Sequence, residues 1–249
     1  MTPIRLARFL ARAGATSRRG AADLVRTGRV AINGRPPTGP GDPVDPDADR
    51  VTVDGRPLTL SDLAWLALHK PVGYVTSRAP TARYPSVFTL LPAASPSLVV
   101  VGRLDVLSEG LLLFTTDGEL AGRLMHPRWQ VPRTYRVWTT GRPPVTEREA
   151  LARGVPVEDD APARPSAWRF RPDAQGGQLE IRLAEGRSRI VRRMAAALGI
   201  GVRRLLRAGY GPIALGTLAP GRSRPLTRRE VEALYRAVGL LPPANPAPA

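Results

Sequence analysis

The chain contains no cysteine, and this absence excludes disulfides, thiol catalysis and cysteine-ligated metal sites. It contains two histidines, His69 and His126, which are too few and too isolated in the sequence to form a metal cluster. We therefore expect no metal and no other cofactor.

Long apolar runs are also missing. No segment reaches the roughly eighteen consecutive apolar residues that a membrane helix needs, and the first residues, MTPIRLARFLARAG, lack the apolar block of a secretory signal. We therefore expect a cytoplasmic protein with no membrane partner. An Arg-rich, acid-poor N-terminus is also typical of an organelle transit peptide, but the segments that follow it argue against this alternative.

Acidic residues are scarce: 21 Asp and Glu stand against 37 Lys and Arg, which gives a formal net charge of +16. Cations placed against phosphates release counterions and strengthen binding, so nucleic acid is the leading partner class. Lys70 is the single lysine, and the abundance of Arg, Ala and Pro reflects a GC-rich genome as much as selection. With 249 residues, 43% of them hydrophobic, the chain can form one large domain or two ordinary ones.

The N-terminal segment predicts two short basic helices. Apolar positions recur at three- and four-residue steps over residues 4–13, and a second helix, capped by Thr16 or Ser17, ends at Gly28. Residues 1–35 hold eight Arg against one acid, a net charge of +7 and a density above that of an ordinary solvated face.

Two similar segments, VAINGRPP (30–37) and VTVDGRPL (51–58), each run into the Asn-Gly or Asp-Gly pair of a tight hairpin turn. Helices and hairpins together resemble the small RNA-binding domain named after ribosomal protein S-four, in which the second helix and the next strand face RNA. The alternative is a basic two-helix cap that binds nothing. The resemblance implies RNA contacts for Arg18, Arg19, Arg26, Arg29 and Asn33.

From about residue 61 strand-like segments alternate with loops. We predict strands in LALHKPVGYVTS, SLVVVGRLD, GLLLFTTDG, TYRVWTTG and GGQLEIRLAEG, and helices at 119–125, 146–153, 189–198 and 228–238. Hairpin-length connections outnumber helical crossovers, which predicts the α+β class with a mainly antiparallel sheet. We expect a small domain at 1–60, a larger one at 61–240 and a disordered tail at 241–249.

The segment GRLDVLSEGLLLFTTDG (102–118) places an acid between two strands that we predict to be buried, LVVVG and LLLFTTDG, with Gly110 in a tight turn. A carboxylate there is costly unless it is paired, and Arg103, two residues from Asp105, shares its face without making an ideal fork. Asp105 is therefore either a functional carboxylate or a residue that caps the turn. The local pattern does not decide between them.

The segment EGRSRIVRRMAAALG (185–199) predicts a basic loop that leads into a helix. Arg189, Arg192 and Arg193 share one face of that helix, and its apolar residues pack on another. Residues 182–229 hold twelve Arg against one acid, a net charge of +11. We expect this second basic zone to bind the same RNA as the first, with some of its arginines merely solvated.

Taken in order, KPVG, GRLDVLSEGLLLFTTDG, RTYRV, EGRSRIVRRM and LLRAGYGPIAL resemble the RsuA/RluB family of ribosomal RNA pseudouridine synthases. The resemblance extends to about Thr227, and its order and spacing are specific. SVFTLLP, after KPVG, resembles the branch that acts on large-subunit RNA. The resemblance implies a monomeric isomerase without a cofactor that acts on ribosomal RNA or a pre-ribosomal particle, with its catalytic domain at 61–240.

The same resemblance implies roles for individual residues. Asp105 matches the catalytic aspartate, Tyr135 matches the tyrosine stacked on the target base, and Arg192 matches the basic partner of the aspartate. Arg193 and Arg103 stay alternatives for that partner, and without the other motifs Tyr135 would be interpreted as a core aromatic. Further RNA or substrate contacts are implied for Arg103, Arg187, Arg189 and Arg193.

The chemistry gives each residue type a reason. Pseudouridine formation breaks the bond between uracil N1 and the ribose, rotates the base and joins C5 to the same sugar carbon. An unprotonated carboxylate can act as the nucleophile, either at uracil C6 or at the ribose, and a neighbouring Arg favours its anion. The nucleotide must leave its stack, and an aromatic platform such as Tyr135 offsets the lost stacking by about 1–3 kcal/mol.

Three positions depart from the family pattern. Ile190 stands where Gln is usual, Val106-Leu107 replaces a charged or aromatic pair, and Arg133 stands where Lys is usual. None of the three removes a reacting group, but Ile190 replaces a polar side chain beside the site, so substrate preference or rate is expected to differ.

Two other functions remain open. The chain could be an RNA-binding ribosome assembly factor that is catalytically inactive, or a basic regulator that binds nucleic acid by charge alone. Asp105, Tyr135 and Arg192 argue against both. We interpret His126 and the four tryptophans, at positions 65, 129, 138 and 168, as packing or rim residues.

Overall fold

The computed structural model describes residues 3–60, 62–92, 97–157 and 160–243. The chain divides into two units: Met1–Ala64 with Ala93–Val99 and Thr115–Gly118, and Trp65–Pro92 with Val100–Phe114 and Glu119–Ala249. The domain limits given above stay predictions. Most of the predicted tail, residues 244–249, lies outside the described residues.

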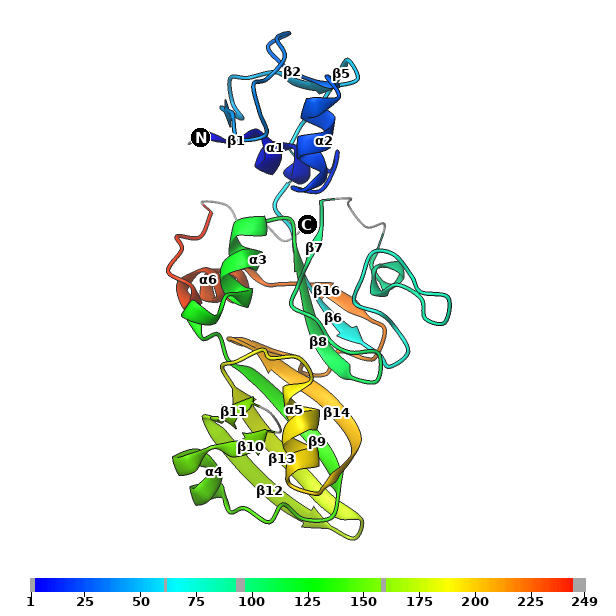
Figure 1. Cartoon of the computed structure of the whole chain (residues 1–249), viewed down its shortest axis with the longest axis vertical. Helices are drawn as coiled ribbons and strands as arrows, with labels where there is room; N and C mark the ends of the chain where they lie inside the picture. Colours follow the sequence, from blue (N-terminus) through cyan, green and yellow to red (C-terminus); the bar gives the residue numbers. More distant parts are fainter. Residues whose placement is uncertain (1–2, 61, 93–96, 158–159, 244–249) are drawn as a thin grey trace. The chain divides into compact units, whose positions relative to one another are not determined.

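The first unit contains two short helices and two small antiparallel sheets (Figure 1). Its elements are β1 (Ile4–Arg5), α1 (Leu6–Arg12), α2 (Gly20–Arg26), β2 (Val30–Ile32), β3 (Pro43–Val44), β4 (Val51–Val53) and β5 (Arg56–Pro57). Leu6, Phe9 and Leu10 of α1 form the centre of its core, as their spacing predicts. The helix begins two residues later than expected because Ile4 and Arg5 pair with β3.

The two hairpin turns of this unit are confirmed. Asn33 and Gly34 have φ of 52° and 79°, and Asp54 and Gly55 have φ of 51° and 76°. Two successive positive φ values are what a type I′ turn requires, and Asn-Gly and Asp-Gly supply them at low cost. The second turn joins β4 to β5, and β2 pairs with β4.

The second unit is built on one large mixed sheet (Figure 1). Its strands are β6 (Trp65–Lys70), β7 (Val99–Val101), β8 (Glu109–Thr115), β9 (Arg133–Thr140), β12 (Ala167–Asp173), β13 (Gly176–Leu183), β14 (Gly201–Tyr210), β15 (Ile213–Ala214) and β16 (Ser223–Pro225). A separate hairpin pairs β10 (Val155–Val157) with β11 (Asp160–Ala163). Its helices are α3 (Gly118–Met125), α4 (Glu147–Arg153), α5 (Ile190–Ala197) and α6 (Arg228–Ala237), with 3₁₀ turns η1 (Val87–Leu90) and η2 (Pro127–Trp129).

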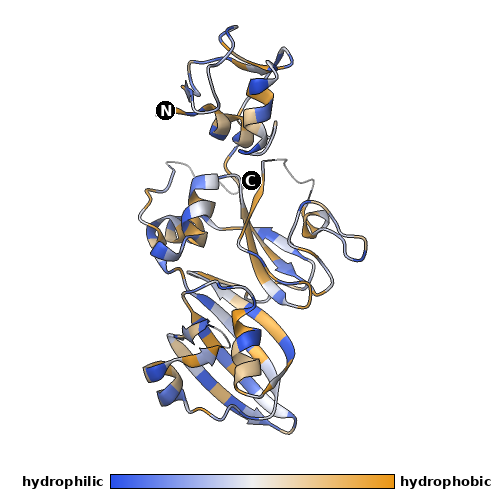
Figure 2. Ribbon diagram, in the orientation of Figure 1, coloured by the Kyte–Doolittle hydropathy of each residue, from blue (hydrophilic) through white to orange (hydrophobic). Residues whose placement is uncertain are grey.

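The strand order β12-β13-β9-β14-β8-β6-β16 brings distant motifs together. β12, β13, β9 and β14 pair antiparallel, whereas β14 and β8 are parallel. Apolar and polar side chains alternate along β9 and β13, which appears as alternating colour bands in Figure 2. The apolar face packs against α5, and this core positions the start of α5 beside β9 and β14.

All four helices predicted in this unit are confirmed to within a residue at each end. α4 and α6 begin with capping boxes, in which the Thr146 and Thr227 hydroxyls accept from the amides of Glu149 and Glu230. Arg224 also forms a two-pronged ion pair with Glu230, which helps to lower the pKa of that carboxyl.

β14 was not predicted as a strand, although it lies at the centre of the sheet. Its pairing with β9 shifts register between Val202 and Arg204 and again between Arg207 and Gly209. The two irregularities break the period-two alternation that identifies a strand in sequence. β12, β10 and β11 were also missed.

Two local predictions around β8 were wrong. Gly110 does not form a turn; it lies inside β8 with φ of 112°, and a Cβ there would be 2.4 Å from the carbonyl oxygen of Arg207. Its role is to let β14 approach β8 closely. β7 is not a fully buried strand, because Val99 is 39% exposed and of its residues Val101 alone is buried.

Gly110 and Gly122 form a matched pair for testing this close approach. Gly110→Ala is expected to lower the free energy of unfolding by more than about 2 kcal/mol, because it adds backbone strain to the overlap with β14. A Cβ at Gly122, inside α3, would meet no atom within 4 Å. Gly122→Ala is therefore expected to raise stability by about 0.5–1 kcal/mol. Urea unfolding of both variants checks the two signs, and equal effects would contradict the packing described for Gly110.

Candidate active site

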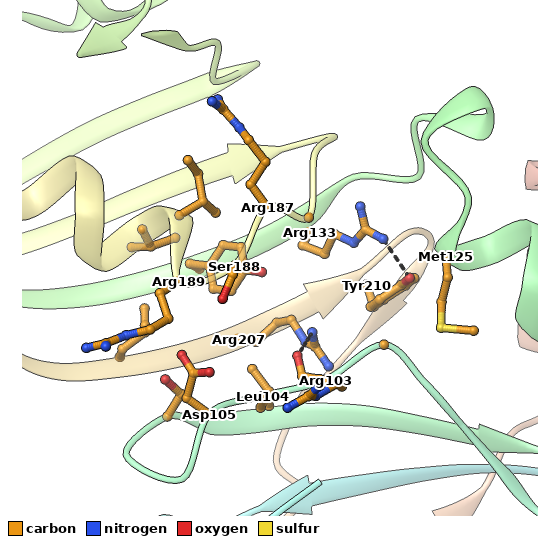
Figure 3. A pocket seen from close by; sticks show the side chains of 17 residues that line it. Arg103, Leu104, Asp105, Met125, Arg133, Arg187, Ser188, Arg189, Arg207 and Tyr210 are labelled. Carbon is orange, nitrogen blue, oxygen red and sulfur yellow. Dashed lines mark hydrogen bonds between the residues drawn. The ribbon is translucent and has the colours of Figure 1, made fainter. Parts of the chain in front are cut away.

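A cavity of about 440 Å³ opens in the second unit, where the loop after β7 meets β9, β14 and the loop before α5. Figure 3 shows Asp105 and Arg189 at one end of it and Met125 and Tyr210 at the other. Its residues are Gly102, Arg103, Leu104, Asp105, Ser108, Met125, Arg133, Tyr135, Gly186, Arg187, Ser188, Arg189, Ile190, Val191, Leu205, Arg207 and Tyr210. Five are arginines, and Asp105 is the one carboxylate among these described lining residues.

Lys70 holds the loop that carries Asp105. Its side chain is fully buried at the end of β6, and Nζ donates to the carbonyl oxygens of Pro71 (3.0 Å), Asp105 (3.1 Å) and Ser108 (2.8 Å). Burial lowers the pKa of Lys70 to about 8, while the negative charge of Asp105 acts in the opposite direction. All three ammonium donors are thus used on backbone, and two of them fix the turn from Asp105 to Ser108.

The segment after Lys70 fixes the same loop from a second side. The hydroxyl of Thr76 donates to the carbonyl of Leu104 (2.7 Å) and accepts from its amide (3.2 Å). The amide of Gly73 donates to the carbonyl of Val106 (2.9 Å). The KPVG motif and Thr76 therefore act on the loop through the backbone, a role that the sequence interpretation did not assign.

None of these contacts involves the carboxylate of Asp105. It is exposed to the cavity, and within the described residues its oxygens have no hydrogen-bond or ion-pair partner. The desolvation cost expected for a carboxylate at this position does not arise, because the side chain is not buried. The structure does not show the turn-capping role that we considered for Asp105. The backbone amide of Ser108 donates to the backbone carbonyl of Asp105 and not to the Asp105 carboxylate.

Arg192 contacts the loop that carries Asp105. Nη2 of Arg192 donates to the carbonyl of Leu107 (2.9 Å). Burial lowers the pKa of Arg192, and the charge of Asp105 acts in the opposite direction. Arg193 donates to Asp160 (3.1 Å). Among the described residues no direct ion pair joins Arg192 to Asp105, and the assignment of Arg192 as its basic partner, with Arg193 and Arg103 as alternatives, stays a prediction.

Tyr135 and Arg207 lie side by side on paired strands. They are register partners on β9 and β14, and both line the cavity, with exposed fractions of 9% and 2%. Arg207 donates from Nε to the carbonyl of Leu111 (2.8 Å) and from Nη1 to that of Arg103 (3.2 Å). Nη2 is buried without a partner within the described part of the chain. Arg207 lies in the segment LLRAGYGPIAL, but no role was predicted for it from the sequence.

Burial is the main influence on the pKa of Arg207 and lowers it, and the neighbouring Tyr135 and Tyr210 act in the opposite direction.

Arg133 contacts Tyr210. Its Nη2 donates to the tyrosine hydroxyl (2.9 Å), as drawn in Figure 3, and its Nη1 donates to the carbonyl of Ala184 (3.2 Å). Arg133 is therefore a buried structural residue of the cavity wall.

The other arginines of this unit for which RNA or substrate contacts are predicted differ in whether an acidic side chain pairs with them. Arg103 and Arg189 are exposed at the cavity, and Arg189 adopts a left-handed conformation (φ 52°) at the start of α5. Arg187 pairs with Glu185 and with Asp160 (2.8 Å). Much of the basic zone at 182–229 is neutralised in this way by acids from other segments, so its net charge overstates the free positive surface.

In the first unit the five predicted RNA contacts are all exposed. Arg29 forms a two-pronged ion pair with Asp54 (2.8 and 2.5 Å), and the side chain of Asn33 donates to Asp49 (2.7 Å), which precedes β4. Arg26 has a long contact with Asp23 (3.5 Å). Those two arginines and Asn33 thus have structural partners. Arg18 and Arg19 have no acidic partner among the described residues.

Within the described ranges, no group of three or more acidic or histidine side chains could hold a metal ion. No helix of the same residues has the length and apolar character to cross a membrane.

Comparison with known proteins adds independent findings. A family model described as RNA pseudouridylate synthase matches residues 64–197, and an S4 domain model matches residues 4–49. An RNA pseudouridine synthase of Aquifex aeolicus is 38% identical to this chain, over 96% of the chain and 97% of the relative. One of Mycobacterium tuberculosis is 42% identical over 95% of both proteins.

A relative named ribosomal large subunit pseudouridine synthase B, from Pseudomonas aeruginosa, is 40% identical over 97% of this chain and 64% of its own length. The crystal structure of a pseudouridylate synthase matches with a TM-score of 0.63 and 30% identity, over 93% of this chain and 99% of the other.

The single lysine allows a direct test of the buried ammonium. Because the pKa of Lys70 is lowered to about 8 in the folded chain, the unfolded chain binds more protons between about pH 8 and 10.5. Stability is therefore expected to rise over that window by on the order of 3 kcal/mol from this group, and the penalty is fully present below pH 8. Selective ¹³C labelling of lysine gives one side-chain signal to follow. Titration at the same pH in native and urea-unfolded protein would contradict the assignment.

Proposed function

The chain belongs to the family of RNA pseudouridylate synthases, in its RsuA/RluB branch, and on that basis we propose that it isomerises one uridine of large-subunit ribosomal RNA with Asp105 as the nucleophile. The observation that carries the proposal is the cavity with Asp105 as its one lining carboxylate, among five arginines and beside Tyr135. A volume of about 440 Å³ is in the range of ligand pockets, and it favours entry of one flipped nucleotide rather than a duplex.

Asp105 acts as the nucleophile through a carboxylate oxygen. Lys70 and Arg192 concentrate positive charge around it, since both donate to backbone carbonyls of the loop that carries it. Neither cation donates directly to its oxygens, so no strong hydrogen bond has to break before the carboxylate attacks. Both routes, addition to uracil C6 and action at the ribose, remain compatible with this arrangement.

Tyr135 and Arg207 act on the base. Tyr135 supports the flipped uracil by stacking, which offsets part of the unstacking cost. When the N1–ribose bond breaks, its electron pair goes to uracil, and the positive charge of Arg207, which lines the cavity, stabilises the charge on the base. The new bond from C5 to the sugar carbon then forms, the bond from Asp105 to uracil C6 or to the sugar breaks and returns the free carboxylate, C5 loses its proton, and N1 gains one. The Tyr135 hydroxyl is positioned beside Arg207 to assist the removal of the C5 proton.

Ile190 is a departure from the family pattern that changes the wall of the cavity. It is 4% exposed and lines the cavity, so an apolar wall replaces the usual amide. Leu107, in contrast, is 66% exposed beside the loop. We expect these differences to affect the choice or rate of the target and not the identity of the reacting groups.

The name of the P. aeruginosa relative supports large-subunit RNA as the substrate, in agreement with the SVFTLLP segment. The S4 domain supports RNA binding by the first unit. A monomeric state and a cytoplasmic location stay predictions. A catalytically inactive assembly factor is the second candidate, and the intact set of Asp105, Tyr135 and Arg192 argues against it.

The role of Asp105 is tested by Asp105→Asn. The amide has no anionic oxygen, so pseudouridine formation in unmodified large-subunit RNA is expected to fall by at least about 10³-fold. Asp62→Asn, at an exposed aspartate whose side chain has no partner among the described residues, is the matched control. Pseudouridine mapping measures both variants, and wild-type yield from Asp105→Asn would refute the assignment.

The RNA-binding role of the first unit is tested by the double variant Arg18→Ala/Arg19→Ala. Each lost phosphate contact reduces the slope of log K against log salt by about 0.7–0.9, so the slope is expected to fall by about 1.5. The control is Arg169→Ala/Arg171→Ala on β12, which removes the same charge from exposed positions. Filter binding to unmodified ribosomal RNA at several salt concentrations compares them. Equal slopes for the two double variants would exclude a specific role for Arg18 and Arg19.

A further inference from the structure

A second hollow, separate from the reacting residues, lies where α3 ends and η2 begins. It has a volume of about 480 Å³ and is lined by Gly122, Arg123, His126, Arg128 and Trp129. We infer that this hollow binds a nucleotide of the single-stranded RNA that flanks the target uridine, by stacking on the Trp129–Arg128 pair and by contact with its phosphate. The inference rests on the proposed function for the identity of the RNA, and it assigns a role to Trp129 and His126, which sequence analysis interpreted as packing or rim residues.

The indole of Trp129 is a fixed platform. Gly239, at the end of α6, lies so close that a Cβ there would be 3.1 Å from ring atom Cζ3. The guanidinium of Arg123 lies 5.1 Å from a ring centroid of Trp129. Arg123 is itself held by Glu119 (3.1 Å) and by the carbonyl of Val238 (3.1 Å). A rigid aromatic surface loses little entropy when a base stacks on it.

Arg128 supplies a positive charge that the protein does not neutralise. Its guanidinium lies 5.7 Å from the Trp129 ring centroid, the side chain is exposed, and it has no acidic partner in the described part of the chain. His126 adds a donor: its Nδ1 accepts from the Arg128 amide (3.1 Å), so the ring proton of the neutral form is on Nε2. The hollow therefore offers an aromatic plane, an unneutralised guanidinium and an imidazole donor, which are the groups that recognise a base and its phosphate.

Gly122 leaves the hollow open on the side of α3. Glycine inside a helix costs about 1 kcal/mol relative to alanine. Packing does not require it, since a Cβ at Gly122 would meet no protein atom within 4 Å. The position faces the hollow, so a larger side chain would occupy space that the protein itself leaves open.

Residues that are neighbours in the chain line the hollow and the catalytic cavity. Met125, which is 42% exposed, lines that cavity at the end opposite Asp105 (Figure 3), and its neighbours Gly122, Arg123 and His126 line the hollow. An RNA strand with its target base in the cavity can therefore cross Met125 and place a neighbouring nucleotide on Trp129. A cationic ligand is disfavoured, because two arginines and no acid line the hollow.

The experiment measures the affinity of the full chain for a fluorescein-labelled oligouridylate of about 12 nucleotides by anisotropy. Arg128→Ala and Trp129→Leu are expected to weaken binding by about 5-fold or more, the lower end of the loss for one stacked base. Arg142→Ala, which removes an exposed arginine without a partner among the described residues, controls for charge and is expected to change affinity less than about 2-fold. Gly122→Glu is expected to weaken binding, whereas Gly122→Ala is not.

Equal affinities within both pairs, Arg128→Ala with Arg142→Ala and Gly122→Glu with Gly122→Ala, would overturn the inference, and this is also the result expected if the hollow serves a protein partner. If Trp129→Leu fails to fold, the two pairs still decide. Pseudouridine formation by the wild-type chain is measured separately. A wild-type chain that binds the probe but makes no pseudouridine contradicts the proposed function and leaves the test of the hollow intact.

Discussion

Hydrogen bonds from buried and half-buried cations to backbone carbonyls hold the loop that presents Asp105. Lys70 donates to the carbonyls of Asp105 and Ser108. Arg192 donates to the carbonyl of Leu107, and Arg207 donates to that of Arg103. Positive charge is thus concentrated around the Asp105 carboxylate, but none of these cations forms an ion pair with it. A direct ion pair would hold the anion equally well but would have to be broken for the carboxylate to react.

The same constraint explains the single lysine. Three carbonyl oxygens converge on one nitrogen at Lys70, and an ammonium offers three donors on a single atom. The planar fork of arginine spreads its donors over three nitrogens and cannot make this arrangement in the same space. In a chain whose other basic residues are all arginine, lysine stands at a position whose geometry excludes the alternative. Burial penalises its charge and lowers its pKa, and the negative charges of Asp105 and Glu109 act in the opposite direction.

Local chemistry explains what could be predicted from the sequence. The helices of the second unit were predictable because apolar spacing and Thr–Glu caps act within a few residues, and the hairpin turns because Asn-Gly and Asp-Gly tolerate positive φ. Asp105 was identifiable as an acid between apolar strands. The roles of Lys70 and Arg207 were not, because both act on carbonyls more than 30 residues away in the chain. Gly110 was misinterpreted for the same reason: the atoms that require a glycine belong to β14.

The cavity and the hollow together suggest how one RNA strand is read. In the function that we propose, the cavity accepts a single base beside Asp105, and in our further inference the hollow at Trp129 offers a second stacking surface. Selection of a target uridine then depends on nucleotides beyond the reacting one, as stacking platforms on a rigid scaffold allow.

The most direct test of this account is a crystal structure of the chain bound to RNA with 5-fluorouridine at the target position, since fluorine at C5 blocks the proton loss that completes the reaction. The account predicts the modified base inside the cavity, beside Tyr135, and an Asp105 oxygen at uracil C6 or at the ribose. A base that remains stacked in the RNA, with the Asp105 carboxylate still facing solvent, would contradict it.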